Sequence, residues 1–122
     1  AEAGDIDNAK KYYNKAISID PNYSDAQTNM AVLILSGEGK IIEQMNSLGS
    51  SAADNKKYDE LKLKREVLYK EAIPYLEESL RIKPNNLQAA KTLMNIYSAL
   101  DEREKFKAIK AKVEALEAGG GN

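Results

Sequence analysis

The sequence contains one spacing of small and apolar residues twice, and each copy ends in a proline followed by asparagine. The first copy consists of Ala9, Tyr13, Ala16, Ile17 and Pro21, and the second of Ala72, Leu76, Ser79, Leu80 and Pro84. Intervals of three and four residues place side chains on one face of an α-helix, and a proline ends a helix because it disfavours helical geometry in the residue before it. An internal repeat of this kind predicts a protein built from stacked helical units.

Composition and charge favour an ordinary soluble helical domain. The 122 residues are 43% hydrophobic and 30% charged, and only 3 are proline, which favours folded helices over disorder. The formal net charge is -1, so the chain lacks the basic excess of a nucleic-acid-binding protein. The longest apolar run covers residues 30–35 and is too short to span a bilayer. We therefore predict that the partner is neither nucleic acid nor the interior of a membrane.

The chain contains no cysteine and no histidine. The first absence excludes disulfides and thiolate metal sites, and the second removes the commonest general base and the commonest metal ligand. Adjacent carboxylates such as Glu77 and Glu78 do acid–base chemistry only in a pocket that shifts their pKa values. The sequence therefore predicts a protein that is not an enzyme and that has no cofactor and no metal.

Helical periodicity and helix-stop residues predict one domain over residues 1–118 and a flexible tail at 119–122. Helices are expected at about residues 5–20, 24–48, 56–83, 86–100 and 102–117. Gly37 and Gly39 interrupt the second helix, but its apolar stripe resumes in phase, so we expect it to continue. Pro74 is expected to kink the third helix without breaking it. Residues 49–55 have the composition of a loop.

The repeated pattern resembles the tetratricopeptide repeat, in which small residues mark the crossing of two helices and a proline ends the unit. The residues that carry the resemblance are Gly4, Ala9, Tyr13, Ala16 and Pro21 in a first repeat, Gln27, Met30, Ala31, Ile34, Tyr69, Ala72, Leu76, Ser79 and Pro84 in a second, and Leu93, Tyr97, Phe106 and Val113 in a third. The resemblance covers nearly the whole chain apart from residues 37–66. It implies an all-α, right-handed superhelix of about two and a half helix-turn-helix repeats.

The middle repeat departs from the family by its length. Pro21 and Pro84 are 63 residues apart (84 − 21), whereas the family's unit is about 34 residues. The excess of about 29 residues corresponds to about eight turns of helix, and about four turns added to each helix would keep both apolar stripes facing inward. We therefore expect residues 37–66 to form a projecting antiparallel hairpin. The chain also resembles a bacterial subset of the family in which the middle repeat is overlong.

The resemblance implies an interaction scaffold that binds a partner peptide or helix in a concave groove, or through the long hairpin. The implied groove residues are Asp25, Thr28, Asn29, Val32 and Ser36 from the second repeat and Gln88, Lys91, Thr92, Asn95 and Ser98 from the third. Asn29, Lys91 and Asn95 resemble residues that grip a peptide carboxylate in chaperone-binding members. Gln88 and Thr92 stand where that clamp has basic residues, which argues against a complete clamp. The alternative interpretation is that all of these are solvated polar residues of a capping repeat.

A second hypothesis is structural self-association. The sequence opens in the second helix of a repeat, so the predicted apolar face of Ile6, Ala9 and Tyr13 has less to pack against. This arrangement is expected of a piece of a longer repeat array, or of a helix that pairs with a second copy. The alternative prediction is therefore a homo-oligomer that forms through the first helix.

Overall fold

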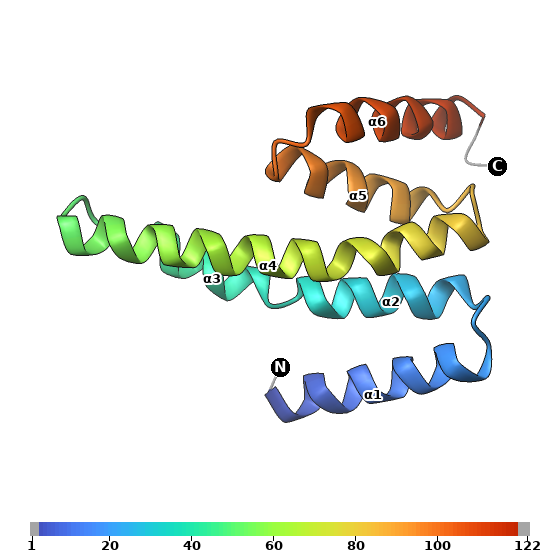
Figure 1. Ribbon diagram of the computed structural model, residues 1–122, viewed down its shortest axis with the longest axis horizontal. Coiled ribbons are helices and arrows are strands. Elements are labelled where there is room, and N and C mark those ends of the chain that lie inside the picture. Colours follow the sequence, from blue (N-terminus) through green and yellow to red (C-terminus); the bar gives the residue numbers. More distant parts are fainter. Residues whose placement is uncertain (1–2, 120–122) are drawn as a thin grey trace.

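A computed structural model describes the backbone of residues 3–119 and the side chains of residues 7–119. The described residues form helices and no strand. The helices are α1 (Ala3–Ile19), α2 (Ser24–Leu35), α3 (Glu38–Asn46), α4 (Ala52–Ile82), α5 (Leu87–Ala99) and α6 (Arg103–Ala118). Figure 1 shows successive rods stacked side by side, with the N-terminus at one edge and the C-terminus at the other. The predicted all-α repeat fold is confirmed.

The core lies where the middle helices cross, and small residues let the helices approach one another closely. Ala31 of α2, Ala72 of α4, and Ala89 and Ala90 of α5 have no exposed surface. Larger apolar side chains fill the space around them, and Leu76 of α4 is also fully buried. This packing explains the alanines at fixed spacing in the sequence, because a bulkier side chain at a crossing would force two helices apart.

The two proline turns have the same geometry. At the first turn the amide of Tyr23 donates to the carbonyl of Asp20, with 3.0 Å between nitrogen and oxygen, and at the second the amide of Asn86 donates to Lys83 at the same distance. In each case the donor lies three residues after the acceptor and the proline lies between them. The repeated sequence therefore produces a repeated turn, which sends α2 back along α1 and α5 back along α4.

The predicted helix over residues 24–48 is wrong in one respect, because it is divided into α2 and α3 at Ser36 and Gly37. The Gly37 amide donates to the carbonyl of Ile34, and the Ser36 hydroxyl donates to the carbonyl of Leu33 at 2.6 Å. In both bonds the acceptor carbonyl lies three residues before the donor. Such bonds tighten the last turn of a helix. Both residues nevertheless keep right-handed helical dihedral angles. The chain therefore continues in the same general direction, and the projecting hairpin survives the break.

The predicted loop over residues 49–55 is shorter than expected, because α4 begins at Ala52. The Ser51 hydroxyl accepts a hydrogen bond from the Asp54 amide at 3.1 Å, and the Asp54 carboxylate accepts one from the Gly49 amide at 2.9 Å. These two bonds cap the helix and order the tip. From there α4 runs without interruption through Pro74 to Ile82, as predicted.

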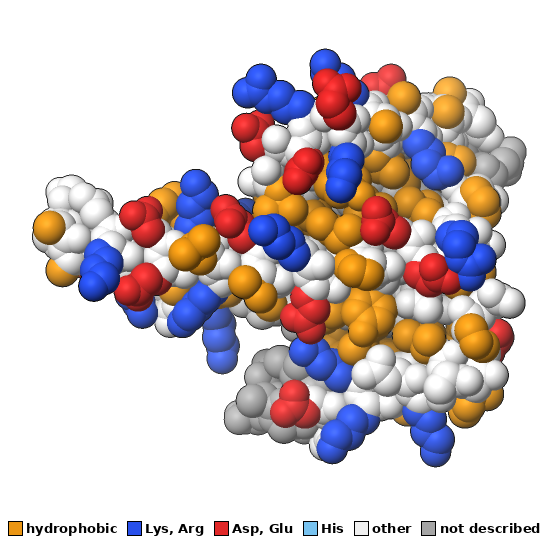
Figure 2. Space-filling model, viewed as in Figure 1, with side chains coloured by type: hydrophobic (Ala, Val, Ile, Leu, Met, Phe, Trp, Pro, Cys, Tyr) orange, Lys and Arg blue, Asp and Glu red, His pale blue; other side chains and the backbone are white. Residues whose placement is uncertain are grey.

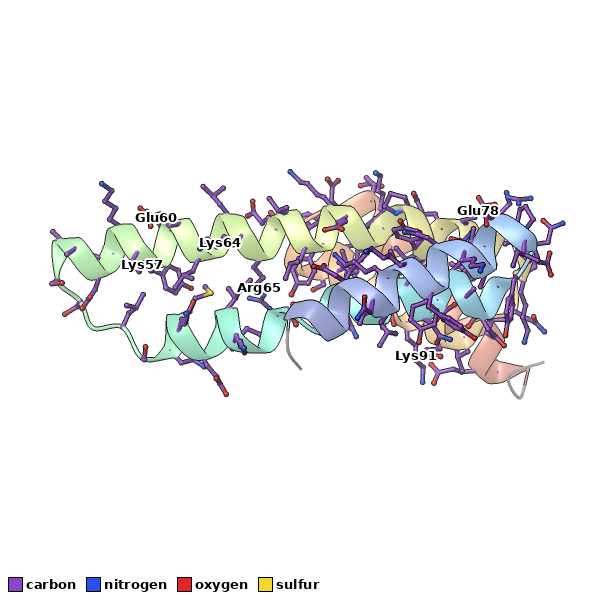
Figure 3. All side chains as sticks on the ribbon, turned by 90° about the horizontal axis from the view of Figure 1, so that it is seen from below. Lys57, Glu60, Lys64, Arg65, Glu78 and Lys91 are labelled. Atoms are coloured by element: carbon purple, nitrogen blue, oxygen red, sulfur yellow. The ribbon has the colours of Figure 1, made fainter. Side chains whose placement is uncertain are left out.

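Residues of α3 and the first half of α4 form the projecting hairpin (Figure 1). Leu61 and Met45 are buried between its two helices. At its root the Arg65 guanidinium donates from Nε to Glu38 Oε2 at 3.3 Å and to the Tyr69 hydroxyl at 2.8 Å. Figure 3 shows Arg65 directed from α4 toward α3. These contacts attach α3 to α4 where the hairpin leaves the body of the molecule.

Candidate partner-binding face

A buried polar cluster joins the first turns of α2 and α5. The Ser24 and Ser79 hydroxyl oxygens are 2.8 Å apart, and those of Thr28 and Ser79 are 2.6 Å apart. Asn86 immediately precedes α5, and its amide nitrogen donates to the hydroxyl oxygens of Ser24, Thr28 and Ser79 at 3.3, 3.1 and 3.0 Å. The Asn86 side-chain oxygen accepts from the Ala89 amide at 3.2 Å and so caps α5. The cluster therefore fixes the position of α2 relative to α5.

Thr28 differs from its prediction as a groove residue. Its side chain is only 3% exposed, and its hydroxyl also contacts the carbonyl oxygen of Ser24 at 3.2 Å. The reason is that Ser79, which stands at the helix crossing of α4, offers Thr28 a partner in the interior. Thr28 is therefore part of the structure that holds the face and is not available to a ligand on its surface.

The remaining predicted groove residues of α2 form an exposed stripe. Asp25, Asn29 and Val32 are exposed, and Val32 keeps 45% of its surface. Their intervals of four and three residues place them one above the other, whereas Met30 between them is buried. Ser36 extends the stripe and is also exposed. One face of α2 therefore supports the core while the neighbouring face offers an acid, an amide and an apolar side chain.

A second stripe lies on α5. Gln88, Lys91 and Asn95 are exposed, and Thr92 is half-buried with its hydroxyl donating to the carbonyl of Gln88 at 2.8 Å. Lys91 Nζ lies 3.3 Å from Glu117 Oε2 of α6, with both side chains about half exposed. Such a pair contributes little to stability because water and salt screen it. Figure 3 shows Lys91 on the opposite side of the molecule from Glu78 of α4.

Sequence reasoning did not predict a cleft of about 340 Å³ between the end of α5 and the start of α6. Its lining residues are Tyr97, Ser98, Asp101, Glu102, Arg103, Phe106, Lys107 and Lys110. Ser98 follows Asn95 by three residues, so the cleft continues the α5 stripe. The resemblance assigned Phe106 only to the third repeat. The one sequence signal that could have indicated this cleft was Ser98, which lies one helical turn beyond Asn95.

A second cleft of about 320 Å³ lies between α4 and α6, where Ala108 and Ile109 form part of an apolar wall and Lys105 and Lys112 lie among the lining residues. Figure 2 shows hydrophobic side chains gathered on the face of the molecule where α4, α5 and α6 lie. Tyr97 also lines the cleft, and its hydroxyl donates to Glu77 Oε2 at 3.3 Å. Burial, together with nearby carboxylates, raises the pKa of Tyr97 to about 12. The phenol therefore stays protonated and keeps this bond even at an alkaline pH at which an ordinary tyrosine ionises.

Comparison with protein families gives a match to the tetratricopeptide repeat at residues 1–23 and 68–86. These segments contain the two copies of the repeated spacing, and each ends just beyond a proline turn. The match identifies tetratricopeptide repeats in these two segments of the chain. Comparison with curated proteins gives no match.

Tetratricopeptide repeats generally mediate protein–protein interaction, and their fold is a non-enzymatic scaffold. In this chain the matched segments correspond to α1 and to the second half of α4, each of which is the second helix of a repeat. The helices α2 and α5 follow the two turns and begin the next repeats. The two exposed stripes therefore lie on equivalent helices of neighbouring repeats.

Over residues 7–119 no cluster of acidic side chains has the composition to hold a metal ion. None of the helices in the described range is long and apolar enough to cross a membrane.

Proposed function

We propose that this protein is a scaffold that binds an extended segment of a partner protein along one face. We call it the α2–α5 face and define it by the exposed residues Asp25, Asn29, Val32, Gln88, Lys91 and Asn95. The observation that carries the proposal is the pairing of two exposed stripes on equivalent helices, held together by a buried polar cluster. Side chains fixed on rigid helices recognise a ligand with little loss of conformational entropy.

The chemistry of the α2–α5 face suits a peptide backbone. The side-chain amides of Asn29 and Asn95 each offer donors and an acceptor, which match the N–H and C=O groups of an extended chain. Val32 adds apolar surface between the polar groups. The long hairpin is the alternative place for a partner, and the experiment below distinguishes the two.

Removing both amides is expected to weaken binding of a peptide ligand. Peptides would be selected from a displayed random library against the immobilised chain, and their affinities measured by fluorescence anisotropy. Each lost hydrogen bond is worth about 1 kcal/mol, so the double substitution Asn29→Ala and Asn95→Ala should reduce affinity by about tenfold or more.

The matched control is Asn46→Ala with Asn55→Ala, which removes two exposed amides from the hairpin. This control should bind like the wild type. Loss of binding in the control together with normal binding in the first variant would contradict the α2–α5 face and assign the partner to the hairpin.

A second candidate function is self-association through α1. Tyr12 and Ile19 are 70% and 74% exposed, whereas Tyr75 and Ile82, which stand 63 residues later at the same repeat positions (75 − 12 and 82 − 19), are half-buried. In α4 these positions are covered by neighbouring helices, and in α1 they form an apolar face without such cover. The side chain of Ile6, which was predicted to belong to the apolar face of α1, lies outside the described residues, as does the predicted tail beyond Gly119.

If α1 pairs with a second copy, sedimentation equilibrium should give a mass above 13.5 kDa that rises with protein concentration. The double substitution Tyr12→Ser and Ile19→Ser should then restore the monomer mass, because exposed apolar side chains drive such contacts. Leu63→Ser with Val67→Ser removes an equally exposed pair from α4 and should leave association unchanged. A wild-type chain that stays monomeric at every concentration would reject this function.

A further inference from the structure

We infer that the cleft between α5 and α6 receives an acidic peptide segment that carries a large apolar side chain. We call it the α5–α6 cleft and define it by Tyr97, Ser98, Phe106, Lys107 and Lys110. The inference rests on the proposed function, because it gives the chemistry of the segment that the scaffold binds. Its volume of about 340 Å³ lies at the lower end of the range for ligand pockets, about 300–1,000 Å³.

The apolar floor of the cleft comes from an open position on α6. Phe106, Lys110 and Glu117 follow one another at intervals of four and seven residues, and Tyr69, Ile73 and Leu80 of α4 follow one another at the same intervals. The three residues of α4 pack into the core, on the helix against which α5 lies. In α6 no helix of the described chain covers the equivalent position. Half-buried Phe106 therefore remains accessible beside the ring of Tyr97.

Positive charge gathers around this floor although the whole chain has a net charge of -1. The residues that line the cleft include three basic ones, Arg103, Lys107 and Lys110, and two acidic ones, Asp101 and Glu102, which gives a net charge of +1 (3 − 2). Lys110 Nζ lies 6.0 Å from the ring centre of Phe106, and Lys105, which lines the second cleft, has its Nζ 5.8 Å from the ring centre of Tyr97.

The cations nearest the aromatic rings are free to pair with a ligand. Arg103, which also lines the cleft, pairs with Asp101 at 3.2 Å. Within residues 7–119 Lys110 forms no ion pair, and Lys107 pairs only with Glu104 at 3.9 Å. That pair is highly exposed, so it is easily broken. Carboxylates that flank an apolar side chain of the bound peptide would therefore meet lysine ammonium groups beside the apolar surface of the cleft. This arrangement favours an acidic partner over a basic or neutral one.

The cleft also lies in line with the α2–α5 face. Ser98 lines the cleft and is exposed, and it follows Asn95 by one helical turn on the same side of α5. A peptide that runs along the α5 stripe toward the end of the helix would reach Phe106 and Lys110 directly. The cleft would then hold one anchoring side chain while the stripe contacts the backbone.

The test uses the full chain and a fluorescein-labelled peptide in which one leucine is flanked on both sides by glutamates. Two matched peptides replace the glutamates by glutamine or the leucine by alanine, and a single-stranded oligouridylate serves as a polyanion. Lys107→Glu with Lys110→Glu should weaken binding of the first peptide by about tenfold or more, because it turns attraction into repulsion at the rim. Both matched peptides should bind more weakly than the first.

The control variant is Lys57→Glu with Lys64→Glu, which makes the same change of charge on the hairpin, as the labels in Figure 3 show. Its affinity should stay within about twofold of the wild type, because exposed charges far from the ligand are screened. Circular dichroism checks that both variants are folded. Equal binding of the glutamate and glutamine peptides, equal loss in the two variants, or equally strong binding of the oligouridylate would overturn the inference.

Amide shifts in a ¹⁵N spectrum separate this inference from the proposed function. Shifts at Ser98 and Phe106 on addition of the acidic peptide support the cleft. Shifts confined to Asn29 and Asn95 would overturn the cleft and leave the α2–α5 face standing. Shifts confined to the cleft would support the inference and contradict the α2–α5 face. A spectrum unchanged at every amide would contradict both.

Discussion

Replacement of Leu76 by alanine is expected to lower the free energy of unfolding by about 2–5 kcal/mol. The Leu76 side chain is fully buried in the core cluster, which also contains residues of α2 and α5. The substitution removes apolar contacts and leaves a cavity that the surrounding helices fill only in part. Urea denaturation followed by circular dichroism measures the effect.

The matched control is Leu63→Ala, which makes the same chemical change on the same helix. Leu63 is 62% exposed on the outer side of the hairpin, so the loss should stay within about 0.5 kcal/mol. Equal losses at the two positions would mean that α4 does not pack against the body as the structure describes. Unfolding that occurs in two steps in the Leu76 variant would show instead that the hairpin and the body unfold separately.

The second large effect is expected at Asn86, whose replacement by alanine should cost about 2–3 kcal/mol. The side chain makes two kinds of contact. Its oxygen caps α5 through the Ala89 amide, and its nitrogen donates to the hydroxyls of Ser24, Thr28 and Ser79. The substitution therefore removes a helix cap and also takes a donor from a buried polar cluster. The same urea denaturation measures the loss.

Ser51→Ala separates these two contributions. Ser51 also caps a helix through the backbone amide three residues later, but it is exposed at the tip of the hairpin. Its replacement should cost about 1 kcal/mol, the usual value for a cap. The additional loss in the Asn86 variant is then the contribution of the buried cluster. If both variants lose the same free energy, the cluster contributes nothing to stability.

The Asn86 cluster also bears on binding, because it determines how the two stripes of the α2–α5 face lie relative to each other. Ser24 and Thr28 come from α2, Ser79 from α4 and Asn86 from the start of α5. A ligand that contacts both stripes needs their separation to be constant. The buried polar residues of this cluster therefore hold the exposed residues of the α2–α5 face in a fixed arrangement for a partner.

The predicted site residues show where sequence reasoning succeeds and where it does not. The resemblance implied that Asn29, Val32 and Asn95 face a groove, and all three side chains are exposed. Exposure along a helix follows its repeat of 3.6 residues. The resemblance also assigned Thr28 to the groove, but its side chain is buried. A threonine at the edge of an exposed stripe turns inward when a buried hydroxyl is within reach, and that hydroxyl belongs to Ser79, a residue 51 positions away.

The sequence by itself determined the helices, the two equivalent turns and the length of the hairpin. Local rules account for these features, because Pro21 and Pro84 each lie where an apolar stripe stops, whereas Pro74 lies inside a stripe that continues, and whole turns of insertion keep a stripe in phase. Only the tertiary structure decided which polar residues are buried, where α2 gives way to α3, and that an open cleft lies beside Phe106. The physical reason is that these depend on contacts between distant residues, such as the hydrogen bond from Asn86 to Ser24, 62 positions away.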